Sequence, residues 1–209
     1  MESKKTGVTP AVGSIYQFGG FDWRVLDVQN NKALLITEKI IEQRAYHVEF
    51  TDITWENCTL REYLNGEFYN SLGAEKSAIA ETRNENPDNP WYGTAGGRAT
   101  TDKVFLLSLD ELVKYFGDSG ALRNKERYEW KNSKYVLSPN GYYLHDQYDE
   151  ARKAHAPAGW TSWWWLRSPG GLSVDAVHVS HDGDILVGGD AVAGWVVGVR
   201  PALWLNSSR

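Results

Sequence analysis

Two motifs frame the C-terminal third of this chain: WWWLRSPG at residues 163–170 and GVRPALWL at residues 198–205. Short β-like stretches lie between them, at 176–179, 184–187 and 195–199. The dipeptides Asp182-Gly183 and Gly188-Gly189 separate these stretches and are typical of hairpin turns. We therefore predict an antiparallel sheet with hairpins in this third of the chain.

The N-terminal region predicts a β-meander. Apolar and alternating patterns indicate strands at 15–21, 23–28 and 33–36. Turns are expected at Gly19-Gly20 and in the segment Gln29-Asn30-Asn31, because glycine and asparagine are common in turns.

Helices are predicted after the meander. A helix is expected over 54–66, since Trp55, Leu60, Tyr63 and Leu64 share one helical face, and Asn65-Gly66 is expected to end it. A second short helix is expected at 67–72. Residues 84–101 are expected to form a loop, because Pro, Asn and Gly dominate them.

A buried strand is predicted at 103–108, followed by a helix over 108–113. Ser108 and Glu111 have the spacing of a capping box, which marks the start of that helix. The predicted fold class is therefore α+β, with helices in the first half and an antiparallel sheet closing the second. Residues 1–13 are expected to be a polar lead-in or linker, and 14–209 a single domain, as 209 residues allow.

Composition and charge limit the classes of partner. The net charge is −5 and the isoelectric point is near 5.6, which argues against nucleic acid and anionic membranes. No apolar run is long enough to span a membrane, and the first ten residues lack the apolar core of a signal peptide, so no cellular location is assigned. The 10 Trp and 11 Tyr residues indicate either an aromatic core or a recognition surface.

No constellation of residues predicts catalysis, a cofactor or a metal. The single cysteine, Cys58, is interpreted as a buried thiol, and one thiol excludes an internal disulfide. His178 and His181 have opposite parity on a strand, so they point to opposite faces unless a turn intervenes. The loop Asn84 to Asn89 contains oxygen ligands that calcium prefers, but turn-forming residues explain it equally well.

Two arginines stand in apolar surroundings near the ends of the predicted sheet. Arg167 and Arg200 are expected to be partly buried and to need backbone carbonyls or a carboxylate as acceptors. We interpret both as structural clamps that join the sheet to the loops, with ligand binding as the alternative.

The frame WWWLRSPG…AVHVSHDG…GVRPALWLN resembles an uncharacterised bacterial family found in gut Firmicutes and their phages. The segments FDWRVLDVQNNKALLITE and TWENCTLREYLNGEFY are similar to the same family, so the resemblance covers most of the chain. It implies a C-type-lectin-like fold, as in formylglycine-generating-enzyme-like domains. The cysteine pair of those enzymes and the calcium and sugar motifs of animal lectins are missing, so the resemblance implies neither activity.

The resemblance also implies a hypothesis about variability. Members of the family often place Asn and Tyr between the fixed residues, as in variable proteins that a diversity-generating retroelement mutates at adenines. Such changes in Asn codons do not produce Lys, Glu, Gln, Met or Trp, and residues 170–199 contain none of these except Trp195. A β segment rich in Gly and Val would explain the same composition, so both interpretations stay open.

The leading hypothesis is a non-enzymatic ligand-binding domain that displays variable contacts on a fixed scaffold. The scaffold positions are Ala176, Val179, Gly183, Ile185, Gly189, Val192 and the strand 198–203. The expected ligand contacts are Leu172, Val174, Asp175, His178, Ser180, His181, Leu186, Val187, Asp190, Ala191 and Trp195.

Trp195 is the expected aromatic anchor, and Leu186 and Val187 cannot both face solvent if their strand is regular. The expected partner is a protein or glycan ligand, in a homo-oligomer or a larger assembly. One alternative is a carbohydrate-active or carbohydrate-binding domain with a Trp-lined cleft. The other is a structural module of a surface or phage-tail protein.

Overall fold

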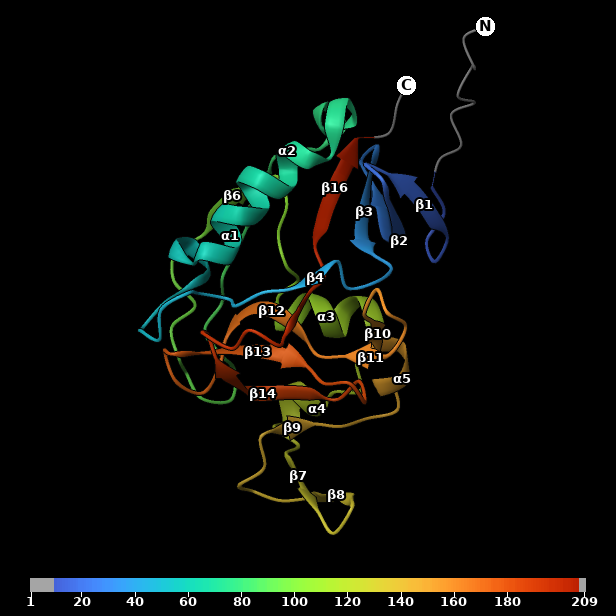
Figure 1. Cartoon of the computed structure of the whole chain (residues 1–209). Helices are drawn as coiled ribbons and strands as arrows, with labels where there is room; N and C mark the ends of the chain where they lie inside the picture. The colour runs from blue at the N-terminus through green and yellow to red at the C-terminus, as the bar shows by residue number, and fades with distance from the viewer. Residues whose placement is uncertain (1–9, 207–209) are drawn as a thin grey trace, which may run out of the picture.

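The predicted meander forms because its turn residues adopt the left-handed backbone that two-residue hairpins require. Gly19, Gly20, Asn30 and Asn31 all have positive φ. In the computed structural model, which describes residues 10–206, these turns join strands β1 (Ile15–Phe18), β2 (Phe21–Gln29) and β3 (Lys32–Thr37). Strand β16 (Ala202–Asn206) pairs antiparallel with β3 and completes a four-stranded sheet (Figure 1).

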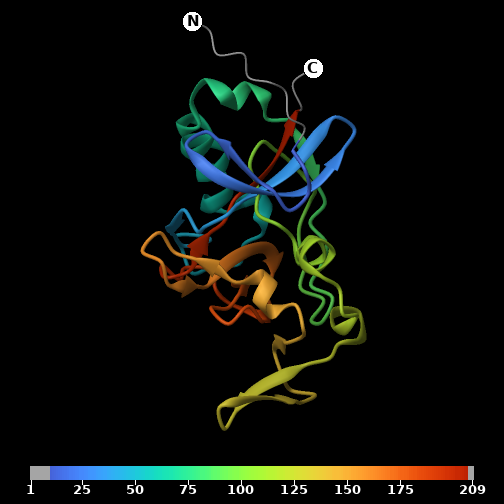
Figure 2. The ribbon, with the colours of Figure 1, turned by 90° about the vertical axis from the view of Figure 1, so that its right-hand side faces the viewer.

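A larger, eight-stranded sheet contains strands from both C-terminal motifs, β12 from the first and β15 from the start of the second. Its strands are, in spatial order, β4 (Glu42–Gln43), β15 (Gly198–Val199), β12 (Trp164–Pro169), β13 (Asp175–Val179), β14 (Ile185–Ala191), β9 (Tyr143–Leu144), β7 (Tyr128–Lys131) and β8 (Lys134–Leu137). The β7–β8 hairpin projects from the body of the molecule (Figure 2). The pairings in this sheet are antiparallel as predicted, except that β15 lies parallel to β12, with Trp164 opposite Gly198. The two framing motifs are therefore neighbours in the sheet.

One continuous helical segment replaces the two helices expected after the meander. It comprises α1 (Thr59–Tyr63), a π-helical stretch (Leu64–Phe68) and α2 (Tyr69–Ser71), and short 3₁₀ turns flank it at Trp55–Asn57 and Gly73–Ala78. Asn65-Gly66 does not end the helix. The Asn65 amide instead donates to the Val104 carbonyl and accepts from the Lys103 and Val104 amides, so it serves the neighbouring segment from within the helix.

The remaining helices lie in the second half of the chain, so helices occur in both halves and not only in the first. They are α3 (Leu109–Phe116), α4 (Ala121–Asn124) and α5 (Asp149–Arg152). The capping box is confirmed: Glu111 N donates to the Ser108 hydroxyl, and Ser108 N donates to the Glu111 carboxylate. The expected strand at 103–108 is buried but makes only one isolated bridge, Phe105 with Ala202.

Small ladders complete the fold and bound its long loop. They are β5 (Thr82–Asn84) with β6 (Thr100–Asp102) and β10 (Ala154–His155) with β11 (Thr161–Ser162). Between β5 and β6 lies the loop that the sequence predicts. None of the helices within residues 10–206 is long and apolar enough to cross a membrane. Residues 1–9 of the expected lead-in lie outside the described residues, and residues 11–14 form a turn that leads into β1.

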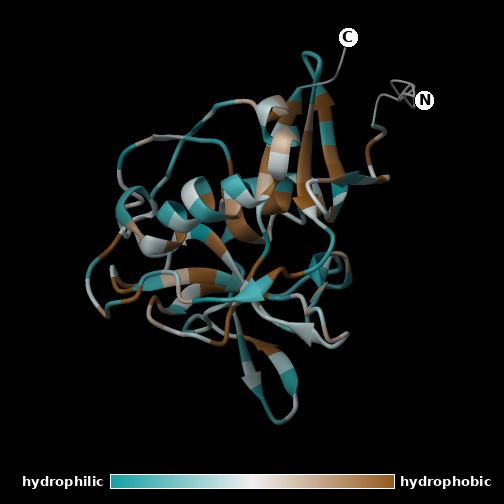
Figure 3. Ribbon diagram, turned by 45° about the horizontal axis from the view of Figure 1, so that its top comes forward, coloured by the Kyte–Doolittle hydropathy of each residue, from teal (hydrophilic) through white to brown (hydrophobic). Residues whose placement is uncertain are grey.

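The core is unusually aromatic. It contains five buried tryptophans, Trp23, Trp55, Trp91, Trp164 and Trp165. Every residue of β12 is buried, including the polar Arg167 and Ser168. Figure 3 shows the apolar stretches concentrated in the central strands and the hydrophilic stretches in the connecting loops.

The Gly188-Gly189 pair does not form the predicted hairpin turn. It lies within β14, while Asp182-Gly183 forms the turn between β13 and β14 as predicted. Ala176 pairs with Asp190 and His178 with Leu186, so residues 187–189 lie opposite the single residue Val177. This bulge bends β14, and the bent stretch forms the floor of the candidate site.

Candidate functional site

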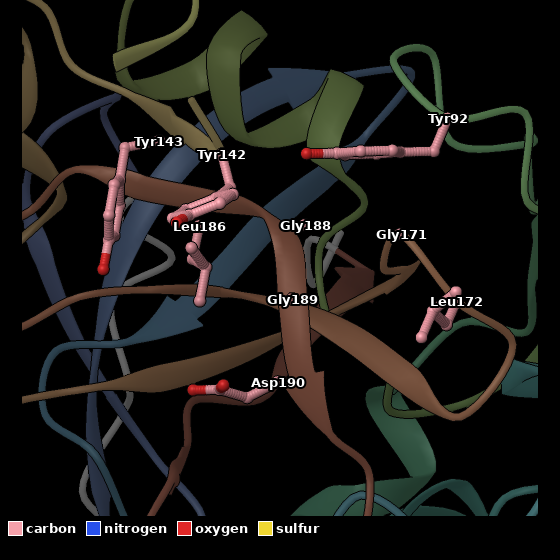
Figure 4. A pocket seen from close by; sticks show the side chains of 9 residues that line it. All are labelled: Tyr92, Tyr142, Tyr143, Gly171, Leu172, Leu186, Gly188, Gly189 and Asp190. Atoms are coloured by element: carbon pink, nitrogen blue, oxygen red, sulfur yellow. The ribbon is translucent and has the colours of Figure 1, made fainter. Parts of the chain in front are cut away.

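A pocket with a volume of about 470 Å³ opens beside the bulge of β14. Segments far apart in the sequence line it: the loop between β5 and β6, the start of β9, the turn after β12, and β14 itself (Figure 4). Its lining residues are Tyr92, Tyr142, Tyr143, Gly171, Leu172, Leu186, Gly188, Gly189 and Asp190.

Glycine backbone forms the floor of the pocket. A Cβ on Gly188 would lie 3.2 Å from the Tyr142 Cβ and 3.4 Å from the Tyr92 hydroxyl, so a side chain there would intrude between the two tyrosines. Gly189 has a φ of +73°, and a Cβ on it would lie 2.5 Å from the Ala176 carbonyl oxygen. The Gly171 amide donates to the Gly188 carbonyl at 2.6 Å and holds the two floor segments together.

The loop that carries Tyr92 is fixed by one buried side chain, Asn89. Its amide nitrogen donates to the carbonyls of Pro169 (2.8 Å) and Val187 (2.9 Å). Its amide oxygen accepts from the backbone N–H of Trp91 (2.9 Å) and of Tyr92 (3.2 Å). Asn89 thus joins β12, β14 and the tyrosine loop through four hydrogen bonds.

Tyr92 is further supported by a cation. The Arg127 guanidinium lies 4.8 Å from the centre of the Tyr92 ring and 5.0 Å from that of Trp91, and it donates to the Trp91 carbonyl. Partial burial raises the pKa of Tyr92, and nearby Tyr142 raises it further while Arg127 opposes the shift. The phenol therefore stays neutral at physiological pH.

A carboxylate stands at the rim of the pocket. Asp190 is half-exposed, and its Oδ2 lies 2.9 Å from Nε2 of the buried His178. That hydrogen bond lowers the pKa of Asp190, so the side chain is ionised at neutral pH. Burial raises the pKa of the neighbouring Asp175, and the charge of Asp190 adds to that shift.

The structure divides the sequence-predicted contacts into three groups. Leu172, Leu186 and Asp190 line the pocket. Val174 and Asp175 are partly exposed, and His181, Ala191 and Trp195 are exposed, but these five do not line it.

Three of the predicted contacts, His178, Ser180 and Val187, are buried and do not line the pocket. Val187 faces the core, and Ser180 donates to the buried Asp184 carboxylate. His178 packs against Trp163 and Trp165 and reaches the pocket only through Asp190. The turn after Ser180 also brings His181 to Trp163, whose indole Nε1 donates to His181 Nδ1 at 2.9 Å.

Sequence reasoning missed all three tyrosines of the pocket. Each follows closely on turn residues, in the segments PWYG (90–93) and NGYY (140–143). Aromatic residues directly beside turn formers are one signal that would have identified them, because such positions lie at the surface.

Arg167 and Arg200 occupy the positions of structural clamps. Arg167 donates to the carbonyls of Leu106 and Glu85, to Asn86 and to the Glu111 carboxylate. Arg200 donates to the Thr37 carbonyl, and its guanidinium lies over the rings of Phe116 (5.5 Å) and Trp164 (5.0 Å). Both side chains are buried away from the pocket.

The asparagine-rich loop and the cysteine also make structural contacts. Asn84 donates to the buried Asp102, and Asn86 donates to the Arg98 carbonyl. Cys58 is buried and accepts from the Arg61 amide at the start of α1. Within residues 10–206, no group of three His, Cys, Asp or Glu side chains is arranged to hold a metal ion.

Comparison with known proteins gives one match. A family model described as a domain of unknown function, DUF6273, matches residues 30–207, a range that includes every residue lining the pocket. No curated protein and no solved structure matches the chain.

Proposed function

The chain belongs to the DUF6273 family, and we propose that it is a non-enzymatic ligand-binding domain whose site is the tyrosine-lined pocket. The observation that carries this proposal is the presence of three partly exposed tyrosines over a rigid floor of glycine backbone. A concave, mostly apolar site with a few polar groups is the usual form of a ligand pocket. Tyrosine provides a large contact area at low entropic cost, as in antibody paratopes.

The arrangement of the framing motifs supports a scaffold with exchangeable contacts. The segment between β12 and β15 adds β13 and β14 to the sheet on one side of β12, and β15 then pairs on the other side of β12. Residues 176–180 and 183–187 of its central hairpin are buried, whereas residues 172–175, 181–182 and 190–191, with Trp195, are at least partly exposed. In the proposal, the fold is C-type-lectin-like, and diversification by a retroelement is confined to these exposed positions.

The chemistry of the residues that line the pocket, and of Cys58, supports a non-enzymatic role in this proposal. Asp190 is the only acidic residue among the nine, so they contain no carboxylate pair for glycoside hydrolysis. Burial raises the pKa of the Cys58 thiol to about 12, which leaves it unreactive as a nucleophile.

Glycan binding is a form of the same proposal, but the expected Trp-lined cleft does not describe this site. No tryptophan lines the pocket, and the exposed Trp130, Trp160 and Trp195 lie on separate elements. The third hypothesis, a structural module, is favoured by the exposed Trp130 and Leu137 on the projecting β7–β8 hairpin. Light scattering tests it: a stable oligomer that a Trp130→Ser change dissociates would support that role.

Screening a fragment library and a glycan array tests the ligand-binding proposal. Gly171→Leu is the blocking variant, because Gly171 has no positive φ and a Cβ there makes only ordinary contacts, with the Tyr92 ring at 3.6 Å. Gly66→Leu is the matched control, because a Cβ on Gly66 points into open space. Ligands that lose binding to Gly171→Leu and keep binding to Gly66→Leu would support the proposal. Ligands indifferent to both changes, or no ligand at all, would refute it.

A further inference from the structure

We infer that the pocket takes a cationic nitrogen group, an ammonium or guanidinium carried on a short aliphatic stem. This inference rests on the proposed ligand-binding function and names the chemical class of its ligand. It depends on three features of the site: the sign of its charge, the faces of its tyrosines and the open oxygen of its carboxylate.

The residues that line the pocket carry charge of one sign, and the nearby Arg127 guanidinium is engaged with the Tyr92 ring and the Trp91 carbonyl. Asp190 is the only charged residue among the nine that line the pocket. The chain contains no Lys or Arg from 168 to 199, although this segment has four aspartates. The charged neighbour of Asp190 on the adjacent strand is the carboxylate of Asp175. An anionic ligand would meet repulsion here, whereas a cation would be attracted.

The tyrosine rings supply a surface that cations prefer. The rings of Tyr142 and Tyr143 lie 5.8 Å apart at 63°, so they present two differently oriented walls. Burial raises the pKa of Tyr143, and Asp184, Asp190 and Tyr142 raise it further, so the phenol stays neutral. The electron-rich face of a neutral phenol ring attracts ammonium and guanidinium groups. The same loop already uses this attraction, with Arg127 over Tyr92.

Asp190 can receive the charged end of the ligand. Its Oδ2 is bonded to His178, while its Oδ1 has no hydrogen-bond partner in the described part of the chain, and the side chain is 53% exposed. Figure 4 shows Asp190 on β14 beyond Gly189, with its side chain in this view on the same side of the strand as Tyr142, Tyr143 and Leu186. Leu172 and Leu186 offer the apolar surface against which an aliphatic stem packs. The pocket therefore offers a carboxylate to the charged nitrogen of the ligand and leucine side chains to its aliphatic stem.

A set of four-carbon compounds that differ mainly in charge tests the inference. n-Butylammonium, 1-butanol and butyrate are titrated into ¹⁵N-labelled protein, together with methyl glucoside as the sugar probe. The readout is the chemical shift of the Gly171, Gly188 and Gly189 amides. We expect butylammonium to shift these amides at the lowest concentration, and Asp190→Asn to weaken its binding about tenfold. Asp182→Asn, an exposed carboxylate in the turn of the same hairpin, is the control and should have no effect.

The source of the cation is distinguished by one further titration. Tighter binding of acetyl-Gly-Lys-Gly-amide than of butylammonium would assign the pocket to a basic side chain of a protein. Equal or weaker binding of the peptide would assign it to a free amine. Both results support the inference.

Three results would overturn it: equal binding of butanol and butylammonium, preference for butyrate or methyl glucoside, or the absence of any shift at these glycines. The screen with Gly171→Leu keeps the two proposals separate. An uncharged ligand that this variant abolishes would leave the ligand-binding function standing while the cationic inference fails.

Discussion

The replacement of Asn89 by alanine tests how the pocket is built. The side chain is buried and makes four hydrogen bonds, two to the carbonyls of Pro169 and Val187 and two from the amides of Trp91 and Tyr92. Alanine removes all four at once, and three of them are buried bonds, to Pro169, Val187 and Trp91. We expect the loop to loosen and Tyr92 to lose its position over Gly188.

The size of the effect follows from those four bonds. At a net value of about 1 kcal/mol each, their loss lowers the free energy of unfolding by about 4 kcal/mol. For a chain of this length, each kcal/mol corresponds to roughly 2–4 °C in Tm, so the expected drop is roughly 8–16 °C. Asn89→Asp should be at least as harmful, because it places a carboxylate against two carbonyl oxygens.

Calorimetry and urea denaturation of Asn89→Ala, Asn89→Asp and wild type measure this difference. Asn140→Ala is the control, since Asn140 is exposed and only its backbone amide makes a hydrogen bond. A Tm within about 3 °C of wild type for both Asn89 variants would show that the four bonds do not hold the loop, and the account of the site would be wrong.

Four further predictions concern single positions. The Cys58 thiol, whose pKa burial raises to about 12, should react with Ellman's reagent at pH 8 only after unfolding; rapid labelling of the native protein would contradict its burial. Trp195→Ala should leave Tm unchanged within about 1 °C, because the side chain is 63% exposed, and a larger loss would mean that the indole packs on the domain. Gly183→Ala should destabilise strongly, since φ is +90° and the new Cβ would lie 1.9 Å from the Asp149 carbonyl oxygen; a native Tm would refute that contact. Burial raises the pKa of Asp146, but hydrogen bonds from Arg152 and other donors outweigh burial and hold the pKa below the ordinary 3.8. The ionised carboxylate therefore stabilises the fold fully above pH 3.8. This stabilisation is lost as the pH falls through the lowered pKa. Asp146→Asn should therefore be less stable than wild type at pH 7, with a gap that narrows below about pH 4 in urea titrations; a constant gap would be inconsistent.

Local signals in the sequence correctly predicted the local structure. The turns at Gly19-Gly20, Asn30-Asn31 and Asp182-Gly183 and the capping box at Ser108 all occur where they were expected. Each depends on backbone dihedrals and hydrogen bonds within about four residues, so neighbouring residues suffice to specify it.

Other local signals were overridden by distant contacts. Asn65-Gly66 has the composition of a helix end, yet its asparagine bonds to residues almost 40 positions away and the helix continues. Gly188-Gly189 has the composition of a turn, yet it becomes a bulge because Ala176 and His178 on the facing strand set its pairing. In both cases, tertiary hydrogen bonds satisfy the backbone in a way that the dipeptide alone does not specify.

The sequence by itself determined the α+β class, the meander turns, the β13–β14 hairpin and an acidic C-terminal segment without Lys or Arg between 168 and 199. Only the tertiary structure decided that this segment shares a pocket with Tyr92 and Tyr142, and that His178, Ser180 and Val187 face inward. Side-chain exposure depends on which surfaces pack together, and the contacts that place Tyr92 over β14 join residues about 80 to 100 positions apart. No pattern within a few residues encodes such contacts, because they form only when the whole chain has folded.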